Sequence, residues 1–214
     1  MKGLFIKDLM ILKSRKQIFF VVAFLAVMYA VLGMHAFAMQ FLGLLGASSV
    51  VSTLSYDFMD NGGTFLFALP FTRRQYLAEK YLISIGGGVV GLLVGLLVVG
   101  FGVLTGTPIN HGEFFAYVAV GVLVAVVMVS LMIPLEIKFG AEQSRTAMFA
   151  VIAGIFIAAV VIAKILPEAI VARIVVFLMH LSQAQLVAGL VGICVVLVTI
   201  SVFLSGLFIK KKEF

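Results

Sequence analysis

Few side chains in this sequence have the type and spacing that catalysis or metal binding requires. The three histidines, His35, His111 and His180, are widely separated in the chain. Neither Glu113 nor Glu168 has a histidine at the helical spacing of a metalloprotease. The sequence therefore favours polar loop residues over a metal site.

Nucleotide-binding and nucleophilic motifs are also missing from the sequence. No G-x-x-x-x-G-K-[ST] motif occurs, and Gly86-Gly87-Gly88 lacks the Lys-Ser/Thr that completes a phosphate-binding loop. Ser48, Ser49 and Ser52 fall in an apolar stretch, where hydroxyls more often serve helix packing than catalysis. The single cysteine, Cys194, excludes a disulfide framework. We expect no enzymatic activity of the chain itself and no directly bound cofactor.

Composition excludes most soluble protein classes. Of the 214 residues, 64% are hydrophobic and only 11% are charged, and the mean hydropathy is +1.28. A soluble domain is about half apolar and roughly a quarter charged, because it needs a charged surface. These values exclude a soluble globular protein, a disordered chain and a nucleic-acid-binding domain, despite a pI of about 9.6. A polytopic membrane protein remains.

Apolar stretches between the charged clusters predict six transmembrane helices. Crossing a bilayer core takes about 20 residues, and the second stretch is short by that measure. The predicted spans are Ile18–Met39, Phe41–Ser55, Tyr81–Leu104, Phe114–Leu135, Thr146–Ala163 and Leu186–Ile209. None alternates polar and apolar residues as the strands of a membrane barrel do. The predicted fold class is therefore an all-α membrane protein, with residues 1–214 forming a single transmembrane domain.

The distribution of basic residues predicts the orientation of these spans. With the N-terminus inside, thirteen of the fifteen Lys and Arg residues fall on the cytoplasmic side, and only Lys164 and Arg173 fall outside. The positive-inside rule strongly favours this arrangement over its inverse. We therefore expect a multi-pass protein with both termini in the cytoplasm.

Two stretches admit other interpretations. Ala36-Phe37-Ala38 resembles a signal-peptidase site, but the apolar stretch before it exceeds the roughly 7–15 residues of a signal peptide. Residues 165–184 are apolar with a helical stripe, yet they contain Pro167, Glu168 and Arg173. A seventh span there would place the C-terminus outside and violate the charge rule. An outer-face amphipathic or re-entrant helix is favoured instead.

The segment before the first span combines an apolar face with positive charge. Leu4, Phe5, Leu9 and Leu12 recur at helical spacing among basic residues. Residues 1–17 are therefore predicted to form an interfacial amphipathic helix on the anionic cytoplasmic leaflet. A plain topology signal is the alternative.

Three glycines form a ridge in the third span. Gly87, Gly91 and Gly95 make a double G-x-x-x-G pattern, which lets helix backbones approach closely. The pattern leaves open whether the partner helix belongs to the same subunit, which we favour, or to another.

The first cytoplasmic loop, residues 56–80, holds the densest polar chemistry. Asp60-Asn61-Gly62-Gly63 is a turn signal. Thr72 and Gln75 fit a capping box, which would start the next helix before it enters the membrane. Between these signals Thr64 to Leu69 is apolar but too short to span. The pattern predicts a short helix parallel to the membrane.

This short helix is expected to meet a partner. Pro70 ends it, and the predicted orientation exposes Phe65, Phe67 and Leu69. Exposed apolar residues on such a loop usually mark a protein partner. The alternative is that the segment dips into the lipid headgroups.

The loop sequence resembles that of a known family. The pattern N-G-x-x-x-L-x-x-L-P-x-T-R, followed by x-x-Y-x-x-x-K-Y, is similar to the first cytoplasmic loop of small bacterial type-2 ABC exporter permeases. The residues that carry it are Asn61, Gly62, Leu66, Leu69, Pro70, Thr72, Arg73, Tyr76, Lys80 and Tyr81. The opening MKGLFIKDLMILKSRK resembles that family's N-terminal interfacial helix. The stretch from Lys138 to Arg145 resembles its second loop, with Gln143 where a Lys is more usual.

The resemblance implies a permease subunit in the bacterial cytoplasmic membrane. A separate ABC ATPase would bind ATP and Mg, and its motion would reach the spans through the short loop helix, as a coupling helix. A second permease, identical or a sister chain, would complete an exporter for an amphipathic or hydrophobic cargo, such as a peptide, a lantibiotic-like toxin or a drug. The implied partner-binding residues are Asn61, Phe65, Leu66, Leu69, Pro70, Thr72, Arg73, Lys138, Gly140, Glu142 and Arg145.

A second function fits the same pattern. A non-transporting membrane scaffold, sensor or immunity protein could bind a partner through this loop. Its ligand would not stimulate an ATPase, which distinguishes the two hypotheses.

Overall fold

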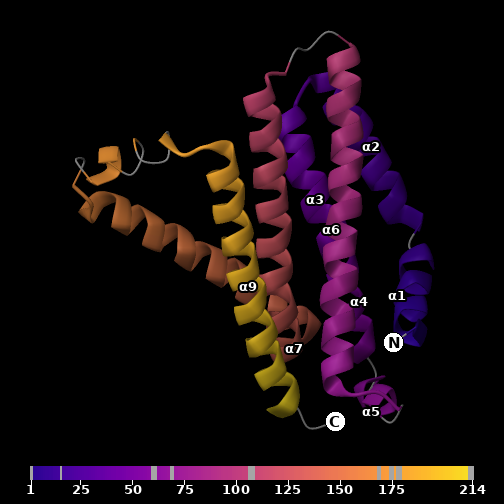
Figure 1. Ribbon diagram of the computed structural model, residues 1–214. Coiled ribbons are helices and arrows are strands. Elements are labelled where there is room, and N and C mark those ends of the chain that lie inside the picture. Colours follow the sequence, from indigo (N-terminus) through magenta and orange to yellow (C-terminus); the bar gives the residue numbers. More distant parts are fainter. Residues whose placement is uncertain are drawn as a thin grey trace.

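Helices account for all the regular secondary structure that is described. The computed structural model describes residues 2–14, 16–58, 62–67, 70–105, 109–167, 170–173, 176 and 180–211. The elements are α1 (Lys2–Ser14), α2 (Lys16–Leu32), α3 (His35–Val51), α4 (Thr53–Phe58), α5 (Gly62–Phe67), α6 (Arg73–Leu104), α7 (His111–Ile165) and α9 (Gln183–Lys211) (Figure 1). The predicted all-α class is confirmed.

Five helical segments in the described part are long and apolar enough to cross a membrane. They are His35–Phe58, Arg73–Leu104, Gly112–Gly140, Glu142–Ile162 and Gln183–Lys211. The predicted second to sixth spans fall on these segments. The apolar part of α2, Phe20–Leu32, is shorter than the roughly 20 residues of a full crossing. The chain is thus a multi-pass membrane protein, and its first span stays a prediction.

The boundary between the first two predicted spans lies at Gly33, and the position inferred beside Gln40 is wrong. Gly33 has a φ of 67°, and the Met34 amide donates to the Tyr29 carbonyl at 3.1 Å. This is the Schellman motif that ends many helices. Gln40 lies inside α3, because one polar side chain does not end a helix whereas a left-handed glycine does.

Glycines allow α3 and α6 to pack backbone against backbone. A Cβ added at Gly91 would lie 2.1 Å from the Leu42 carbonyl oxygen, and one at Gly87 would lie 2.6 Å from the Gly46 oxygen. Only glycine fits at such approaches. The prediction that the ridge packs within the subunit is confirmed.

Hydroxyl groups join α9 to the same bundle. The Tyr81 hydroxyl on α6 lies 2.5 Å from Ser201 Oγ and 2.9 Å from Ser205 Oγ on α9. Ser201 also donates to the Ser130 carbonyl of α7 at 2.6 Å. Such polar contacts hold apolar helices in register where the hydrophobic effect cannot.

The helix α7 is divided at Gly140, where φ is 79° and ψ is 179°. Beyond this residue α7 diverges from the bundle, as the brown segment of Figure 1 shows. No side chain that is described between residues 145 and 162 is buried. Residues 147–162 of α7 therefore present an apolar surface all round, as a helix does in lipid.

The predicted helix at the N-terminus is present, and it packs against the bundle. Leu4 and Asp8 of α1 are buried, whereas Ile6, Leu9 and Met10 are exposed. The apolar face inferred from spacing is thus divided between the bundle and the surroundings. Its place on a membrane surface stays a prediction.

The predicted outer-face helix of residues 165–184 is described only in part. Residues 170–173 are helical, and Pro167 precedes them. Glu168 and the stripe residues Ile174, Phe177 and Leu178 lie outside the described residues.

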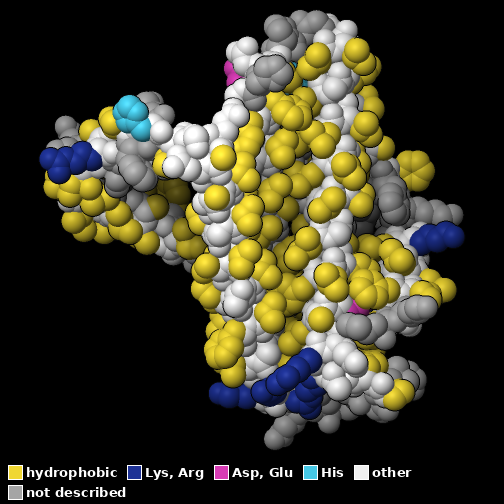
Figure 2. All heavy atoms as spheres, viewed as in Figure 1, with side chains coloured by type: hydrophobic (Ala, Val, Ile, Leu, Met, Phe, Trp, Pro, Cys, Tyr) yellow, Lys and Arg dark blue, Asp and Glu magenta, His cyan; other side chains and the backbone are white. Residues whose placement is uncertain are grey.

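The surface is apolar along the helices and basic at one end of the bundle. Hydrophobic side chains cover most of the visible face along the helices (Figure 2). Lys and Arg side chains gather where α6 begins and α9 ends, with others on the α1 flank and on the outlying segment. This pattern suits helices surrounded by lipid.

The close contact of α3 with α6 predicts a strong effect of one methyl group. We expect Gly91→Ala to lower the stability in detergent by about 1–3 kcal/mol, because the two backbones must separate. The measurement is the temperature at which the monodisperse chromatographic peak is lost. Gly100→Ala is the matched control, since a Cβ there meets nothing within 4 Å. Equal stability of the two variants would contradict the packing.

Candidate functional site: a buried ionic junction

Four charged side chains meet at the end of the bundle where α1, α4 and α6 come together. Lys80 Nζ lies 2.5 Å from Asp8 Oδ2 and 2.8 Å from Asp57 Oδ2. Lys7 Nζ forms an ion pair with Asp57 Oδ1 and lies 3.2 Å from Asp8 Oδ1. Asp8, Asp57 and Lys80 are buried. We call Lys7, Asp8, Asp57 and Lys80 the ionic junction.

Uncharged groups complete the junction. The Tyr76 hydroxyl donates to Asp57 Oδ2 at 2.9 Å, and Thr53 Oγ1 donates to Asp8 Oδ2 at 3.1 Å. Lys80 Nζ is also 3.1 Å from Thr53 Oγ1 and lies 5.5 Å from the centroid of the Tyr76 ring. Buried charges require such partners, because desolvation otherwise costs several kcal/mol per ion.

Helical spacing explains why these residues converge. Thr53 and Asp57 are four residues apart on α4, and Tyr76 and Lys80 are four residues apart on α6. Residues i and i+4 lie on one face of a helix. Each helix therefore turns one polar face toward the others.

Sequence reasoning missed this junction. The sequence assigns Lys80 to the cations that set the topology. The available signal was the i, i+4 pairing of polar residues at the ends of two neighbouring apolar segments. The partner Asp8 is 72 residues from Lys80, and nothing local in the sequence pairs them.

Two further carboxyl groups are buried nearby. Glu136 of α7 accepts a hydrogen bond from Ser55 Oγ. Glu79 of α6, next to Lys80 in the chain, is also buried.

The predicted site residues of the first loop have several different roles. The capping box is confirmed: the Gln75 amide donates to Thr72 Oγ1 at 3.2 Å, and the Thr72 amide donates to Gln75 Oε1 at 3.0 Å. The Arg73 guanidinium donates to the carbonyls of Ile209 and Lys210 at 2.9 and 3.1 Å. It therefore ties the start of α6 to the end of α9.

The short helix of this loop is present as α5, immediately before the capping box. Leu66 is buried with 7% of its surface exposed and belongs to the main apolar core. In this structure it anchors α5 to its own chain, and its expected contact with a partner stays a prediction. Pro70 is exposed, whereas Asn61, Leu69 and the side chain of Phe65 lie outside what the structure describes.

The second predicted loop lies at the division of α7. Gly140 provides the break, and Lys138 Nζ lies 5.2 Å from the centroid of the Phe208 ring of α9. Glu142 and Arg145 are exposed beyond the break. The expected contact of these two side chains with a partner stays a prediction.

The histidines do not form a site in the described part of the chain. His35 is buried, and a Cβ at Gly102 would lie 1.9 Å from its ring, so it packs inside the bundle rather than in a polar loop. Among the described residues, no three His, Cys, Asp or Glu side chains are grouped as a metal site requires.

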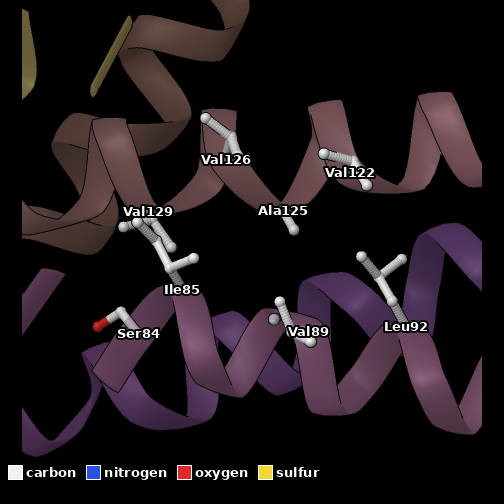
Figure 3. Close-up of a pocket in the computed structure, with 9 residues that line it drawn as sticks. Ser84, Ile85, Val89, Leu92, Val122, Ala125, Val126 and Val129 are labelled. Atoms are coloured by element: carbon white, nitrogen blue, oxygen red, sulfur yellow. The ribbon is translucent and has the colours of Figure 1, made fainter. Parts of the chain in front are cut away.

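A recess and a groove lie between the apolar helices. A recess of about 70 Å³ lies between α6 and α7, with Ile85 and Leu92 pointing from α6 toward α7 (Figure 3). An open groove of about 390 Å³ lies between α2 and α3, beside Ser48 and Ser49. These serines donate to carbonyls three residues earlier, so their hydroxyls are bonded within α3.

Comparison with known proteins gives one match. The model of a family described as ABC-2 family transporter protein matches residues 3–210. No curated protein and no solved structure matches the chain.

Removing the shared cation should destabilise the bundle. We expect Lys80→Met to cost about 3–5 kcal/mol, because it leaves two buried carboxylates with one ammonium partner. Thermal unfolding in detergent measures the loss, and Lys211→Met at an exposed site serves as the control. The double variant Asp8→Asn/Lys80→Met should lose less than the sum of its single variants. Additive losses would contradict the pairing.

The break in α7 makes a separate prediction. We expect Gly140→Ala to lose about 1–3 kcal/mol, because its backbone angles are accessible almost only to glycine. Gly154→Ala, in the regular part of α7, should be neutral or stabilising, since alanine is the better helix former. A Cβ meets nothing within 4 Å at either position. Steric clashes therefore do not contribute to the difference between the two variants. The same detergent assay decides, and an unchanged Gly140→Ala would argue against the break.

Proposed function

Because the chain belongs to the ABC-2 family of transporter proteins, we propose that it is the transmembrane permease subunit of an ATP-driven ABC exporter. The observation that carries this proposal is the family match over residues 3–210. The apolar, multi-pass bundle supports it, since such a subunit must be embedded in the bilayer. ATP and Mg would be bound by a separate ATPase chain.

We place the basic end of the bundle in the cytoplasm. The start of α6 and the end of α9 carry Lys and Arg residues, and cytoplasmic segments of membrane proteins are enriched in these. In a bacterial cytoplasmic membrane, this orientation turns α5 and the break at Gly140 toward the ATPase.

The geometry favours α5 as the element that receives motion from the ATPase. It lies between α4 and α6, both of which contribute to the ionic junction, and Leu66 fixes it to the core. A displacement of α5 would therefore be carried into α6 as a rigid-body motion rather than absorbed by a flexible loop. Phe65, Leu69 and the exposed Glu142 and Arg145 would contact the ATPase.

The transported molecule is proposed to be amphipathic or hydrophobic. The lipid-spanning parts are poor in charge, which suits a peptide, a lantibiotic-like toxin or a drug better than an ion. Inside the bundle, the recess of about 70 Å³ between α6 and α7 is far smaller than the roughly 300–1,000 Å³ of drug-sized pockets, and the groove of about 390 Å³ between α2 and α3 is open rather than enclosed. A route between two permease subunits, identical or sister chains, accommodates such a cargo better.

Capture of the ATPase tests this function. We expect the tagged protein, purified from its own host in detergent, to retain a P-loop ATPase, and Phe65→Asp to release it because a charge replaces an apolar contact. Phe114→Asp is the control, an exposed aromatic at the opposite end of the bundle. Both variants must insert and elute as monodisperse protein. A wild-type protein that retains no P-loop ATPase would indicate the non-transporting scaffold, sensor or immunity protein instead.

A further inference from the structure

One buried carboxyl group beside the ionic junction has no partner of its own. Glu79 has 0% of its surface exposed, and neither of its oxygens accepts a hydrogen bond from a described donor. An ionised carboxylate in this situation would cost several kcal/mol, since burial removes it from bulk solvent and no described donor solvates it. Glu79 therefore requires a neutralising ligand.

The carboxyl of Asp8 identifies that ligand. Its negative charge and its hydrogen bonding both act on the Glu79 carboxyl across the contact between α1 and α6. Asp8 Oδ2 is already bonded to Lys80 and Thr53, whereas Oδ1 has the Lys7 ammonium 3.2 Å away but accepts no hydrogen bond from a described donor. Two neighbouring carboxylates repel each other when both are ionised. One proton between them replaces this repulsion with a hydrogen bond.

The local charge balance leads to the same conclusion. Among the described side chains, the cations that act on Glu79 are Lys7 from α1 and Lys80 from α6. The carboxyl groups near them are those of Asp8, Asp57 and Glu79. If all three were ionised, negative charges would outnumber positive ones. Tyr76 donates its hydroxyl proton to a hydrogen bond with Asp57 and adds no positive charge, and Glu136 from α7 adds a further acid near Lys80.

We propose that Asp8 and Glu79 form a proton-binding site and share one proton between α1 and α6. The pair then carries a single negative charge. This charge and the charge of Asp57 together balance the ammonium groups of Lys7 and Lys80. Loss of the proton places a second negative charge between α1 and α6 and favours their separation. The site is independent of which ATPase or cargo the protein uses.

Infrared spectroscopy of the purified full chain at neutral pH tests this site, with the proton itself as the ligand. A protonated carboxyl gives a carbonyl stretch that is distinct from the carboxylate bands and shifts in D₂O. We expect this acid band in the wild type and its loss in Glu79→Gln, whose amide can donate to Asp8 as the acid does. Asp8→Asn should also abolish it, because Glu79 then ionises toward the new amide donor. Glu113→Gln, at an exposed site, should keep the band.

Glu136 is the competing source of an acid band, so Glu136→Gln is measured as well. An acid band that survives Glu136→Gln and disappears in Glu79→Gln or Asp8→Asn supports the shared proton. If neither of those two variants yields folded protein, a band that survives Glu136→Gln still supports it. A wild-type spectrum without an acid band, or a band lost only in Glu136→Gln, would overturn the proposal.

Discussion

The structure depends on the pairing of charge where three helices exclude water. Each of α1, α4 and α6 brings ionised side chains to the ionic junction, and none of these groups could be buried alone without a penalty of several kcal/mol. Such a cluster is weak evidence for high stability, because desolvation offsets much of the attraction. It does restrict the arrangement of the helices, since a shift of one helix would separate the paired groups. The N-terminal helix thereby becomes part of the bundle.

The first loop takes its shape from the same constraint. Its beginning is held by Asp57 in the junction, and its end is held by the capping box at Thr72. Between them Leu66 anchors α5 in the apolar core. These three described attachment points would let a displacement of α5 reach the bundle, as the proposed contact with an ATPase would require.

Features that depend on neighbours in the chain could be predicted from the sequence, and those that depend on distant residues could not. The capping box of Thr72 and Gln75 and the glycine ridge around Gly91 follow from local spacing, and both are present. The first apolar helix ends at Leu32 and not near Met39, because a reading of apolar stretches between charges passes over the left-handed Gly33. The pairing of Asp8 with Lys80 and that of Arg73 with Ile209 join segments that are far apart, and single-sequence patterns carry no signal for them.

The contact between Arg73 and the end of α9 also bears on how the protein is made. Arg73 and Ile209 are separated by 136 residues, so this contact cannot form until every later span has been synthesised. Membrane helices insert one after another, and α3 and α6 can associate through their glycines while α9 is still on the ribosome. The end of the bundle where α6 begins and α9 ends therefore assembles last. A chain whose synthesis stops early would lack this contact. Its exposed end would then be accessible to the proteases that remove incomplete membrane proteins.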